Sequence, residues 1–392
     1  MSPSPLRVLV VLGTRPEAIK LFPIIACLRA QSDVNVRVLV TGQHRKMLDE
    51  VLGPFDVRPD LDLDVMRPQQ SLNELVARIV PGFDQVLEYE RPEVIVVQGD
   101  TTTAFCAALV GFHRRIKVAH VEAGLRTGDR FHPYPEEVNR RMIASCADVH
   151  LAPTATAAEH LRAEGISEDA IFITGNTAID ALHLALEKLP ARASRAAGER
   201  DVLITLHRRE VWNEPGSAGA TVLDDILSGI ADVAGAHADV AFTYPVHLNP
   251  GVRGPVSRTL AGRPNVHLVE PMPYLEFVGA MRRSEVIVTD SGGIQEEAPS
   301  LGVPVLVIRK TTERAEALAT GSGKLVGITR GAVRTALEAA LANPSERVAT
   351  LPCPSPFGDG RAAERTLQAL RFATGRTNER PLPPDVMAPA SS

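Results

Sequence analysis

The sequence predicts an α/β protein made of two doubly wound, Rossmann-like domains that face a cleft. Short β-rich apolar runs alternate with helix-length segments along both halves of the 392-residue chain, as in parallel sheets wound by helices. Many runs are apolar throughout, as strands buried on both faces are. The alternation stops once, near residue 190, and then resumes, which indicates two domains.

The strands expected in the first half cover residues 7–13, 36–41, 94–98, 117–121, 149–152 and 171–174. Helical periodicity lies between them, for example over residues 18–29, 71–89, 103–114 and 137–145. The strands expected in the second half cover residues 202–206, 240–244, 266–269, 286–289, 303–308 and 325–326.

The domain boundaries follow from composition. Residues 190–200 read P-A-R-A-S-R-A-A-G-E-R, without apolar periodicity, and predict a linker or hinge between a domain of residues 1–189 and a domain of residues 201–360. Residues 361–374 carry the pattern of a final amphipathic helix. Residues 375–392 are rich in Pro, Ala and Ser, which predicts a disordered tail.

Composition narrows the functional class. The chain is 44% hydrophobic and 23% charged, as in a soluble globular enzyme. A net charge of −5 and 4% aromatic residues argue against a nucleic-acid partner. The apolar runs are shorter than a membrane span, and the N-terminus lacks the marks of a signal peptide. The four cysteines form no C-x-x-C pair, which favours a reducing cytoplasm.

Cations surround the first strand-to-helix turn, where residues 13–20 read G-T-R-P-E-A-I-K. A helix N-terminus flanked by Arg15 and Lys20 suits a diphosphate. A surface turn with solvated cations is the alternative. The turn lacks the glycine pattern of a dinucleotide fingerprint or a Walker loop.

Carboxylates follow the next strands of the first half. Asp100 follows the third expected strand, Glu122 ends the fourth, and Glu136 and Glu137 open the next helix. Because ligands bind beyond the carboxyl ends of such strands, we expect these groups to share one site. Crowded carboxylates raise one another's pKa, so an acid and a base can coexist. A helix N-cap for Asp100 and first-turn helix charge for Glu136 and Glu137 are the alternatives.

Two histidines follow strands of the second half. His207 comes after the first strand, in H-R-R-E, and His247 lies in P-V-H-L-N-P. A histidine here can donate a proton to a leaving phosphate, and a structural role is the alternative. No H-x-x-x-H or H-E-x-x-H pattern occurs, so we expect no catalytic metal.

A second anion site is predicted at residues 290–297, which read D-S-G-G-I-Q-E-E. Ser291, Gly292 and Gly293 would present backbone N–H groups where a helix begins. Glu297, one turn later, can accept hydrogen bonds from a ribose diol, and Arg314 adds a cation. A structural glycine turn is the alternative.

Eight strings in this order resemble the non-hydrolysing UDP-N-acetylglucosamine 2-epimerases, over about residues 6–372. They are G-T-R-P-E-A-I-K, G-D-T-T-T, H-V-E-A-G-L-R-T, P-E-E-x-N-R, I-T-G-N-T-x-I-D, H-R-R-E, P-V-H-x-N-P and D-S-G-G-I-Q-E-E-A-P-S-L-G. The resemblance implies the B-type glycosyltransferase architecture and no cofactor. It also implies C2 epimerisation of a UDP-sugar by anti elimination of UDP, through 2-acetamidoglucal, followed by re-addition.

The resemblance also implies roles for individual residues. The acid/base carboxylates would be Asp100, Glu122 and Glu136, with His207 near the UDP phosphates. The residues that match UDP contacts are Arg15, Lys20, Phe277 on the uracil side, Ser291, Gly292, Gly293, Glu297 and Arg314.

Many bacterial relatives bind a second substrate molecule as an allosteric activator. The residues that match this second site are Gln43, Gln70, Glu136, Arg208 and His247, whereas Lys46 stands where glutamine is usual and Gln69 where arginine is. The resemblance further leads us to expect a homodimer that supplies a precursor of cell-envelope polysaccharide. A hydrolysing 2-epimerase and a B-type glycosyltransferase remain as alternatives, and the clustered carboxylates count against the second.

Overall fold

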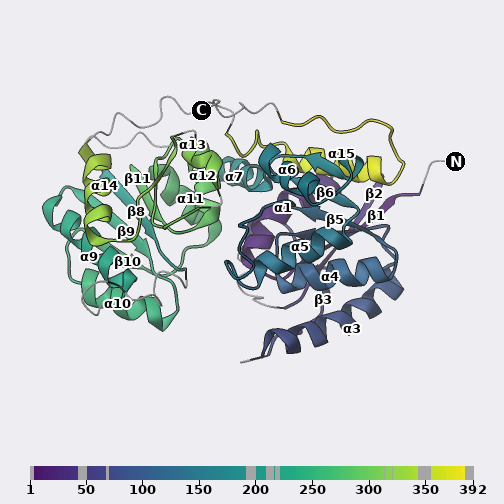
Figure 1. The fold of residues 1–392 in the computed structure, drawn as a ribbon, viewed down its shortest axis with the longest axis horizontal. Helices are drawn as coiled ribbons and strands as arrows, with labels where there is room; N and C mark the ends of the chain where they lie inside the picture. The colour runs from purple at the N-terminus through teal and green to yellow at the C-terminus, as the bar shows by residue number, and fades with distance from the viewer. Residues whose placement is uncertain are drawn as a thin grey trace. The chain divides into compact units, whose positions relative to one another are not determined.

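The computed structural model describes residues 4–42, 51–67, 70–190, 200–208, 216, 221–312, 314–319, 321–342 and 355–384. The chain divides into two compact units (Figure 1). Unit 1 holds residues 1–184 and 357–386, and unit 2 holds residues 185–356 and 387–392.

Unit 1 is built on a parallel sheet with the order β3-β2-β1-β4-β5-β6-β7. Its strands are β1 (Leu6–Leu12), β2 (Val34–Val40), β3 (Leu61–Asp62), β4 (Val94–Gln98), β5 (Lys117–Val121), β6 (Val149–Ala152) and β7 (Ile171–Ile173). The helices are α1 (Arg15–Arg29), α3 (Leu72–Glu90), α4 (Thr102–His113), α5 (Glu136–Cys146), α6 (Ala155–Ala163), α7 (Thr177–Lys188) and α15 (Ala362–Ala373), with short 3₁₀ turns at Gly53–Phe55 and Glu168–Ala170.

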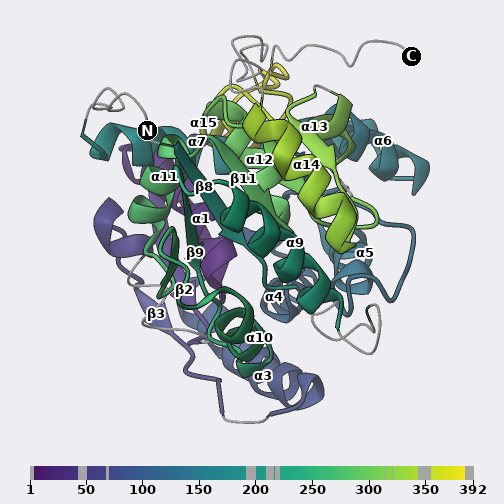
Figure 2. The same ribbon diagram turned by 90° about the vertical axis from the view of Figure 1, so that its left-hand side faces the viewer.

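Unit 2 repeats this architecture with the strand order β10-β9-β8-β11-β12-β13, again parallel. The strands are β8 (Arg200–Thr205), β9 (Val240–Pro245), β10 (Val266–Val269), β11 (Val286–Thr289), β12 (Val305–Val307) and β13 (Gly323–Leu325). The helices are α9 (Val222–Ala236), α10 (Pro250–Leu260), α11 (Tyr274–Arg283), α12 (Gly292–Ser300), α13 (Ala315–Ala319) and α14 (Arg330–Ala342). Helices α9 and α14 lie side by side (Figure 2), and with α10 they bury one face of the sheet.

The predicted α/β class with two doubly wound domains is confirmed, and each of the twelve expected strands corresponds to a strand of the structure. The prediction missed β3, whose two residues are too short for an apolar pattern. The strand β4 is buried at every residue, which explains its unbroken apolar sequence.

Each sheet has a point where the strand order reverses. In unit 1 the strand β1 pairs with β2 on one side and β4 on the other. In unit 2 the strand β8 pairs with β9 and β11. Ligands of doubly wound sheets bind beyond the carboxyl ends of strands at such points. We therefore expect functional residues in the turns that follow β1, β4 and β5 in unit 1 and in those that follow β8 and β11 in unit 2.

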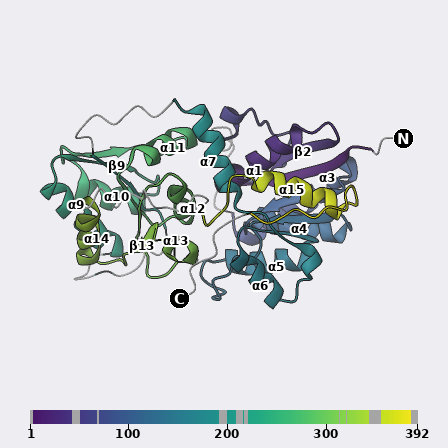
Figure 3. The ribbon, with the colours of Figure 1, turned by 90° about the horizontal axis from the view of Figure 1, so that it is seen from above.

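The C-terminal part of the chain returns to unit 1. Helix α15 packs against α1 (Figure 3). The carboxylate of Asp180 accepts hydrogen bonds from the backbone N–H groups of Ala362 and Ala363, at 3.1 and 2.8 Å. Residues 357–360, which the sequence placed in the second domain, also belong to unit 1, since the N–H of Asn176 donates to the carbonyl of Phe357.

The prediction of a disordered tail from residue 375 is wrong for residues 375–384. Arg376 forms an ion pair with Glu93 at 3.0 Å, and the guanidinium of Arg380 lies 4.5 Å from the centre of the Phe172 ring. Composition could not reveal these long-range contacts of single arginines. Residues 385–392 and most of the predicted linker, 191–199, lie outside the described residues. Among the described helices, none is long and apolar enough to cross a membrane.

Candidate active site

A buried carboxylate organises the turn after β1. Glu17 accepts hydrogen bonds from the N–H groups of Gly13 and Thr14 and from the hydroxyl of Thr14, at 3.0, 2.6 and 2.8 Å. Its second oxygen accepts from the hydroxyl of Thr101 at 2.7 Å. Burial raises the pKa of Glu17, and these hydrogen bonds oppose the rise. Glu17 thus ties the turn that carries Arg15 to the turn after β4.

The sequence assigned no role to Glu17, although the Thr14-x-x-Glu17 spacing of a capping box was visible. In the structure Glu17 is 1% exposed and completes that box at the start of α1. Arg15, the first residue of the same helix, is partly exposed.

The second carboxylate, Glu122, ends β5 and is surrounded by donors. Its Oε1 lies 2.5 Å from the ammonium of Lys20, and its Oε2 accepts from the amide of Gln98. The backbone of Glu122 has φ = 63°, a left-handed conformation that is costly for this residue type. Strain of this kind persists where surrounding contacts hold it, as they do here at the end of β5.

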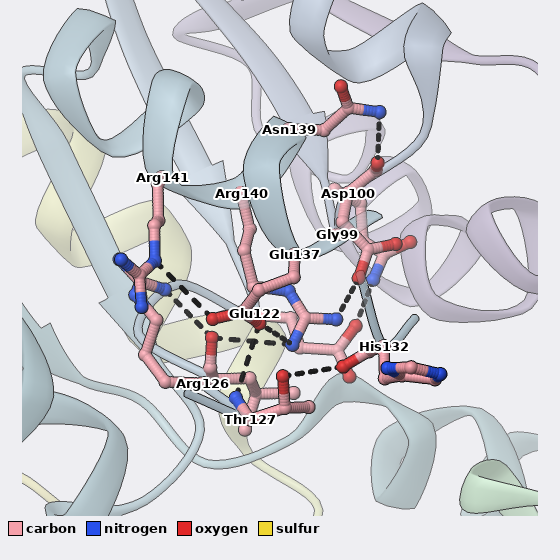
Figure 4. A network of polar contacts seen from close by, with 12 residues as sticks. Gly99, Asp100, Glu122, Arg126, Thr127, His132, Glu137, Asn139, Arg140 and Arg141 are labelled. Carbon is pink, nitrogen blue, oxygen red and sulfur yellow. Dashed lines mark hydrogen bonds and ion pairs between the residues drawn. The ribbon is translucent and has the colours of Figure 1, made fainter. Parts of the chain in front are cut away.

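Asp100 follows β4 and is held by α5. Arg140 donates to its carboxylate, and the amide of Asn139 donates to its carbonyl at 2.9 Å (Figure 4). Burial alone lowers the pKa of Arg140, but the charge and hydrogen bond of Asp100 overcome this effect, so the net pKa is raised. The predicted alternative, an N-cap role for Asp100, is wrong: Thr101 caps α4 by accepting from the N–H of Ala104 at 3.1 Å.

Glu136 and Glu137 have different surroundings. Glu136 begins α5 and is partly exposed, whereas the side chain of Glu137 is completely buried. Glu137 pairs with Arg140 at 3.2 Å and Arg141 at 3.4 Å, and its Oε2 accepts from the N–H of Thr127. Figure 4 shows Arg140 between Glu137 and Asp100. Glu137 therefore holds Arg140 and the loop before α5.

A neutral histidine supports the Asp100 turn. The Nε2 atom of His120, on β5, lies 2.7 Å from the carbonyl oxygen of Gly99. Burial lowers the pKa of His120 to about 3, so the ring is neutral and Nε2 donates to this carbonyl. Gly99 has φ = 69°, which glycine adopts without strain. Apart from the position of His120 in an expected strand, no sequence pattern indicates this role.

In unit 2, Asp290 lies directly after β11 and is fully buried. Its Oδ2 accepts from the backbone N–H groups of His207 and Arg208, each at 2.9 Å. Its Oδ1 lies 3.2 Å from Nδ1 of His207. The ring of His207 is stacked with the ring of His247, with centroids 6.1 Å apart and 22° between planes. The structure thus brings the two predicted histidines together around Asp290.

The predicted anion cradle begins α12, with Ser291 as its N-cap residue. Arg314 lies against it: its guanidinium contacts Glu296 at 2.9 Å, and a Cβ on Gly292 would come 2.8 Å from its Cζ. A Cβ on Gly293 would meet nothing within 4 Å. Gly292 is therefore the glycine that allows the cation to approach the start of α12.

The other predicted residues are placed as follows. Glu297 is 7% exposed on α12, and Phe277 is partly buried on α11. Gln70 precedes α3, and its Oε1 accepts from the N–H of Arg67 at 2.8 Å. Gln43, Lys46 and Gln69 lie outside the described residues. Within the described ranges, no group of three or more acidic, histidine or cysteine side chains could hold a metal ion.

The chemical capacity of the two units differs. Unit 1 places two ionisable carboxylates, Asp100 and Glu122, at the ends of the neighbouring strands β4 and β5, each beside a different cation. Such groups can accept and return protons. Unit 2 offers a helix N-terminus, Arg314 and a histidine backed by an aspartate, which suit an anion such as a diphosphate.

The chain is similar to known proteins over most of its length. Residues 26–371 match the model of the family described as UDP-N-acetylglucosamine 2-epimerase. The UDP-N-acetylglucosamine 2-epimerase of Yersinia pestis is 46% identical over 377 residues, covering 93% of this chain and 98% of that protein.

Solved structures are similar to this chain as well. The crystal structure of the Neisseria meningitidis UDP-GlcNAc 2-epimerase bound to UDP-GlcNAc has a TM-score of 0.86 at 41% identity, covering 93% of this chain and 99% of that one. A kitacinnamycin glycosyltransferase is 15% identical with a TM-score of 0.60, covering 94% of this chain and 100% of that one. That likeness concerns the fold alone and agrees with the glycosyltransferase-like architecture expected from the sequence. With the match over most of its length and the identity to these relatives, the chain belongs to the UDP-N-acetylglucosamine 2-epimerase family.

Proposed function

We propose that this isomerase interconverts UDP-N-acetylglucosamine and UDP-N-acetylmannosamine by anti elimination and re-addition of UDP. The observation that carries the proposal is the pair of carboxylates at neighbouring strand ends, Asp100 with Arg140 and Glu122 with Lys20. Inversion at C2 needs one group to remove the proton and another, differently placed, to return it. Asp100, Glu122 and Glu136 supply the candidates.

Elimination suits a carbon whose C–H bond is only mildly acidic. The departing diphosphate takes the electron pair of the C1–O bond while a carboxylate takes the C2 proton, so no free carbanion forms. The product of this step is 2-acetamidoglucal. Protonation at C2 from the other face and attack of UDP at C1 complete the epimerisation. Every atom lost in the first half is regained in the second, so the scheme requires no redox cofactor.

In this proposal UDP is held mainly by unit 2. Ser291, Gly292 and Gly293 offer backbone N–H groups to the diphosphate, Arg314 adds a cation, and Glu297 accepts from the ribose diol. Phe277 would lie on the uracil side. His207 exchanges a proton with the diphosphate. The match of Arg15 and Lys20 to UDP contacts of the family stays a prediction, and Lys20 also pairs with Glu122.

The same proposal includes a second substrate site, the cellular compartment and the oligomeric state. Gln43, Gln70, Arg208 and His247 are the residues we propose for an allosteric second substrate site, with Glu136 shared. We also propose that the chain forms a homodimer and that it is located in the cytoplasm. The free thiols of the described cysteines, Cys27, Cys106 and Cys146, fit a reducing compartment. Sedimentation of the purified chain at micromolar concentration tests the dimer.

The function is tested by incubating the chain with UDP-N-acetylglucosamine in D₂O without added NAD and resolving the products by NMR. We expect UDP-N-acetylmannosamine with deuterium at C2. Epimerised product that keeps its original C2 hydrogen would contradict the elimination mechanism. Free UDP with free N-acetylmannosamine as the equilibrium products would instead identify the hydrolysing reaction.

A further inference from the structure

The two histidines of unit 2 differ in what surrounds their Nδ1 atoms. Nδ1 of His207 lies 3.2 Å from the carboxylate of Asp290. Nδ1 of His247 accepts a hydrogen bond from the backbone N–H of Asn249 at 3.2 Å. An acceptor beside Nδ1 favours a proton on that nitrogen, whereas a donor beside it requires its lone pair. These surroundings favour opposite tautomers in the two rings.

Burial and backbone hydrogen bonds hold the side chain of Asp290 in one position. It is fully buried, and its Oδ2 accepts from the N–H groups of His207 and Arg208. Its own N–H donates to the carbonyl of Thr205, so the strand ends of β8 and β11 are locked together. The carboxylate is thus held at a fixed place beside Nδ1 of His207, whose side chain is 43% exposed.

Three other described groups lie near this histidine, namely Tyr244, His247 and Arg208. Tyr244, from β9, donates its hydroxyl to the carbonyl of Leu206 at 3.1 Å. Burial and the nearby Asp290 raise the pKa of Tyr244, so it stays a neutral donor. Burial and the neighbouring His207 lower the pKa of His247, which Asp290 opposes. Arg208 follows His207 in the chain and is a cation among the described residues there.

We propose that Asp290 is a positioning residue that keeps the proton on Nδ1 of His207, so that Nε2 is the nitrogen that exchanges a proton with the diphosphate. This inference rests on the proposed function for its catalytic part. When the C1–O bond breaks, its electron pair stays on the diphosphate oxygen. The imidazolium of His207 gives that oxygen the Nε2 proton and becomes the neutral Nδ1–H tautomer. Re-addition of UDP returns the proton to Nε2.

The tautomers are measurable without any catalysis. We would record ¹⁵N spectra of the histidine rings in the full chain at pH 8, with His207→Gln and His247→Gln used only to assign the signals. We expect the proton on Nδ1 in His207 and on Nε2 in His247. A proton on Nε2 of His207 overturns the proposal, whether or not the chain epimerises a sugar. Failure of the D₂O experiment with the expected tautomers would instead reject the proposed function alone.

The positioning role is tested with Asp290→Asn, whose single amide oxygen cannot accept from both backbone N–H groups and from Nδ1. We expect kcat to fall about 10- to 100-fold, less than the roughly 100- to 10,000-fold loss of a complete acid–base group because His207 itself remains. UDP affinity should change less than threefold. Loss of the anion should also change the profile of kcat against pH, because the carboxylate no longer faces Nδ1 of His207.

Asp232→Asn is the matched control, because Asp232 pairs with Arg330 in the same unit at 2.7 Å, away from these histidines. It should leave kcat and the pH profile as in the parent chain. If Asp290→Asn loses UDP affinity in proportion to kcat, with the tautomer and the pH profile unchanged, Asp290 merely supports the start of α12 and the proposal is wrong. If this variant does not fold, the ¹⁵N spectra of the unaltered chain still decide.

Discussion

The ammonium of Lys20 lies 2.5 Å from Oε1 of Glu122, joining the second turn of α1 to the end of β5. Both side chains are about nine-tenths buried, with 11% and 9% exposed. A buried charge that loses its partner is strongly unfavourable. Lys20 is therefore the counter-charge of a candidate catalytic carboxylate, in addition to any contact with a diphosphate.

This relationship predicts the effect of Lys20→Met. Because Glu122 would lose its cation, we expect kcat to fall by about 100-fold, as for loss of an acid–base group, with a smaller change in UDP affinity measured by calorimetry. Lys117→Met, at the exposed start of β5, is the control and should behave as the parent chain. A large loss of UDP affinity with unchanged kcat would show instead that Lys20 acts only on the diphosphate.

The carboxylates themselves give a second prediction. Asp100→Asn and Glu122→Gln should each slow turnover by a factor on the order of 100 or more. UDP affinity should be largely kept, because the proposed nucleotide contacts lie in unit 2. Asp84→Asn removes a carboxylate that pairs with Arg114 on the partly exposed surface of α3 and α4, and should leave turnover unchanged. Turnover within threefold of the parent chain for both site variants would contradict the acid–base assignment.

Two glycines near the acidic site should respond differently to alanine. Gly124 has φ = 89°, and a Cβ there would come 2.1 Å from the backbone oxygen of Ala157. Gly128 has φ = 80°, but its Cβ would meet nothing within 4 Å. We expect Gly128→Ala to cost about 1 kcal/mol of unfolding free energy from backbone strain. Gly124→Ala should cost several kcal/mol more, or prevent folding, because backbone atoms must move.

Urea unfolding of the two variants measures this difference. Both sites share the left-handed conformation, so the contact with Ala157 is the main difference between them. Equal losses of stability would mean that close packing of Gly124 against α6 contributes nothing.

A nucleotide-binding prediction concerns Glu297. Glu297→Ala should weaken UDP binding by about 10- to 100-fold, since a buried ribose diol would lose a charged acceptor worth about 1.5–3 kcal/mol. Glu338→Ala, which removes a glutamate paired with Arg334 on α14, is the control. Unchanged UDP affinity in a folded Glu297→Ala chain, measured by calorimetry, would count decisively against the ribose contact.

The buried histidines predict how stability depends on pH. Burial lowers the pKa of His120 to about 3 and that of His150, its neighbour across β5 and β6, to about 4, from an ordinary value of 6.5. Below pH 6.5 the unfolded chain binds protons that the folded chain excludes. The free energy of unfolding should therefore fall as pH decreases from 6.5, by up to about 1.4 kcal/mol per pH unit for each histidine.

Urea unfolding between pH 7.5 and 5 tests this slope. His120→Asn should flatten it, since the asparagine amide does not titrate in this range. His113→Asn, at the exposed end of α4, is the matched control and should keep the slope of the parent chain. An identical slope in the His120 variant would exclude His120 as a source of the pH dependence.

The sequence by itself determined the fold class and most strand positions, because strands that are buried on both faces consist of unbroken apolar runs. It also placed the candidate site residues at strand ends, since a turn after a buried strand that carries Asp100, Glu122 or His207 stands out from its apolar surroundings. The family resemblance rested on the same local strings.

The tertiary structure decided which side chains meet. Lys20 and Glu122 are 102 residues apart, and Asp290 and His207 are 83 apart, so no local pattern specifies these pairs. The same holds for Glu17, which the sequence shows only as a helix-capping residue. It holds also for residues 375–384, whose arginines contact Glu93 and Phe172. Apolar periodicity is a local property of the chain, so it can be recognised in the sequence without knowledge of the fold. Ion pairs and hydrogen bonds depend on how the strand order of each sheet brings distant turns to one edge, and that order exists only in the folded chain.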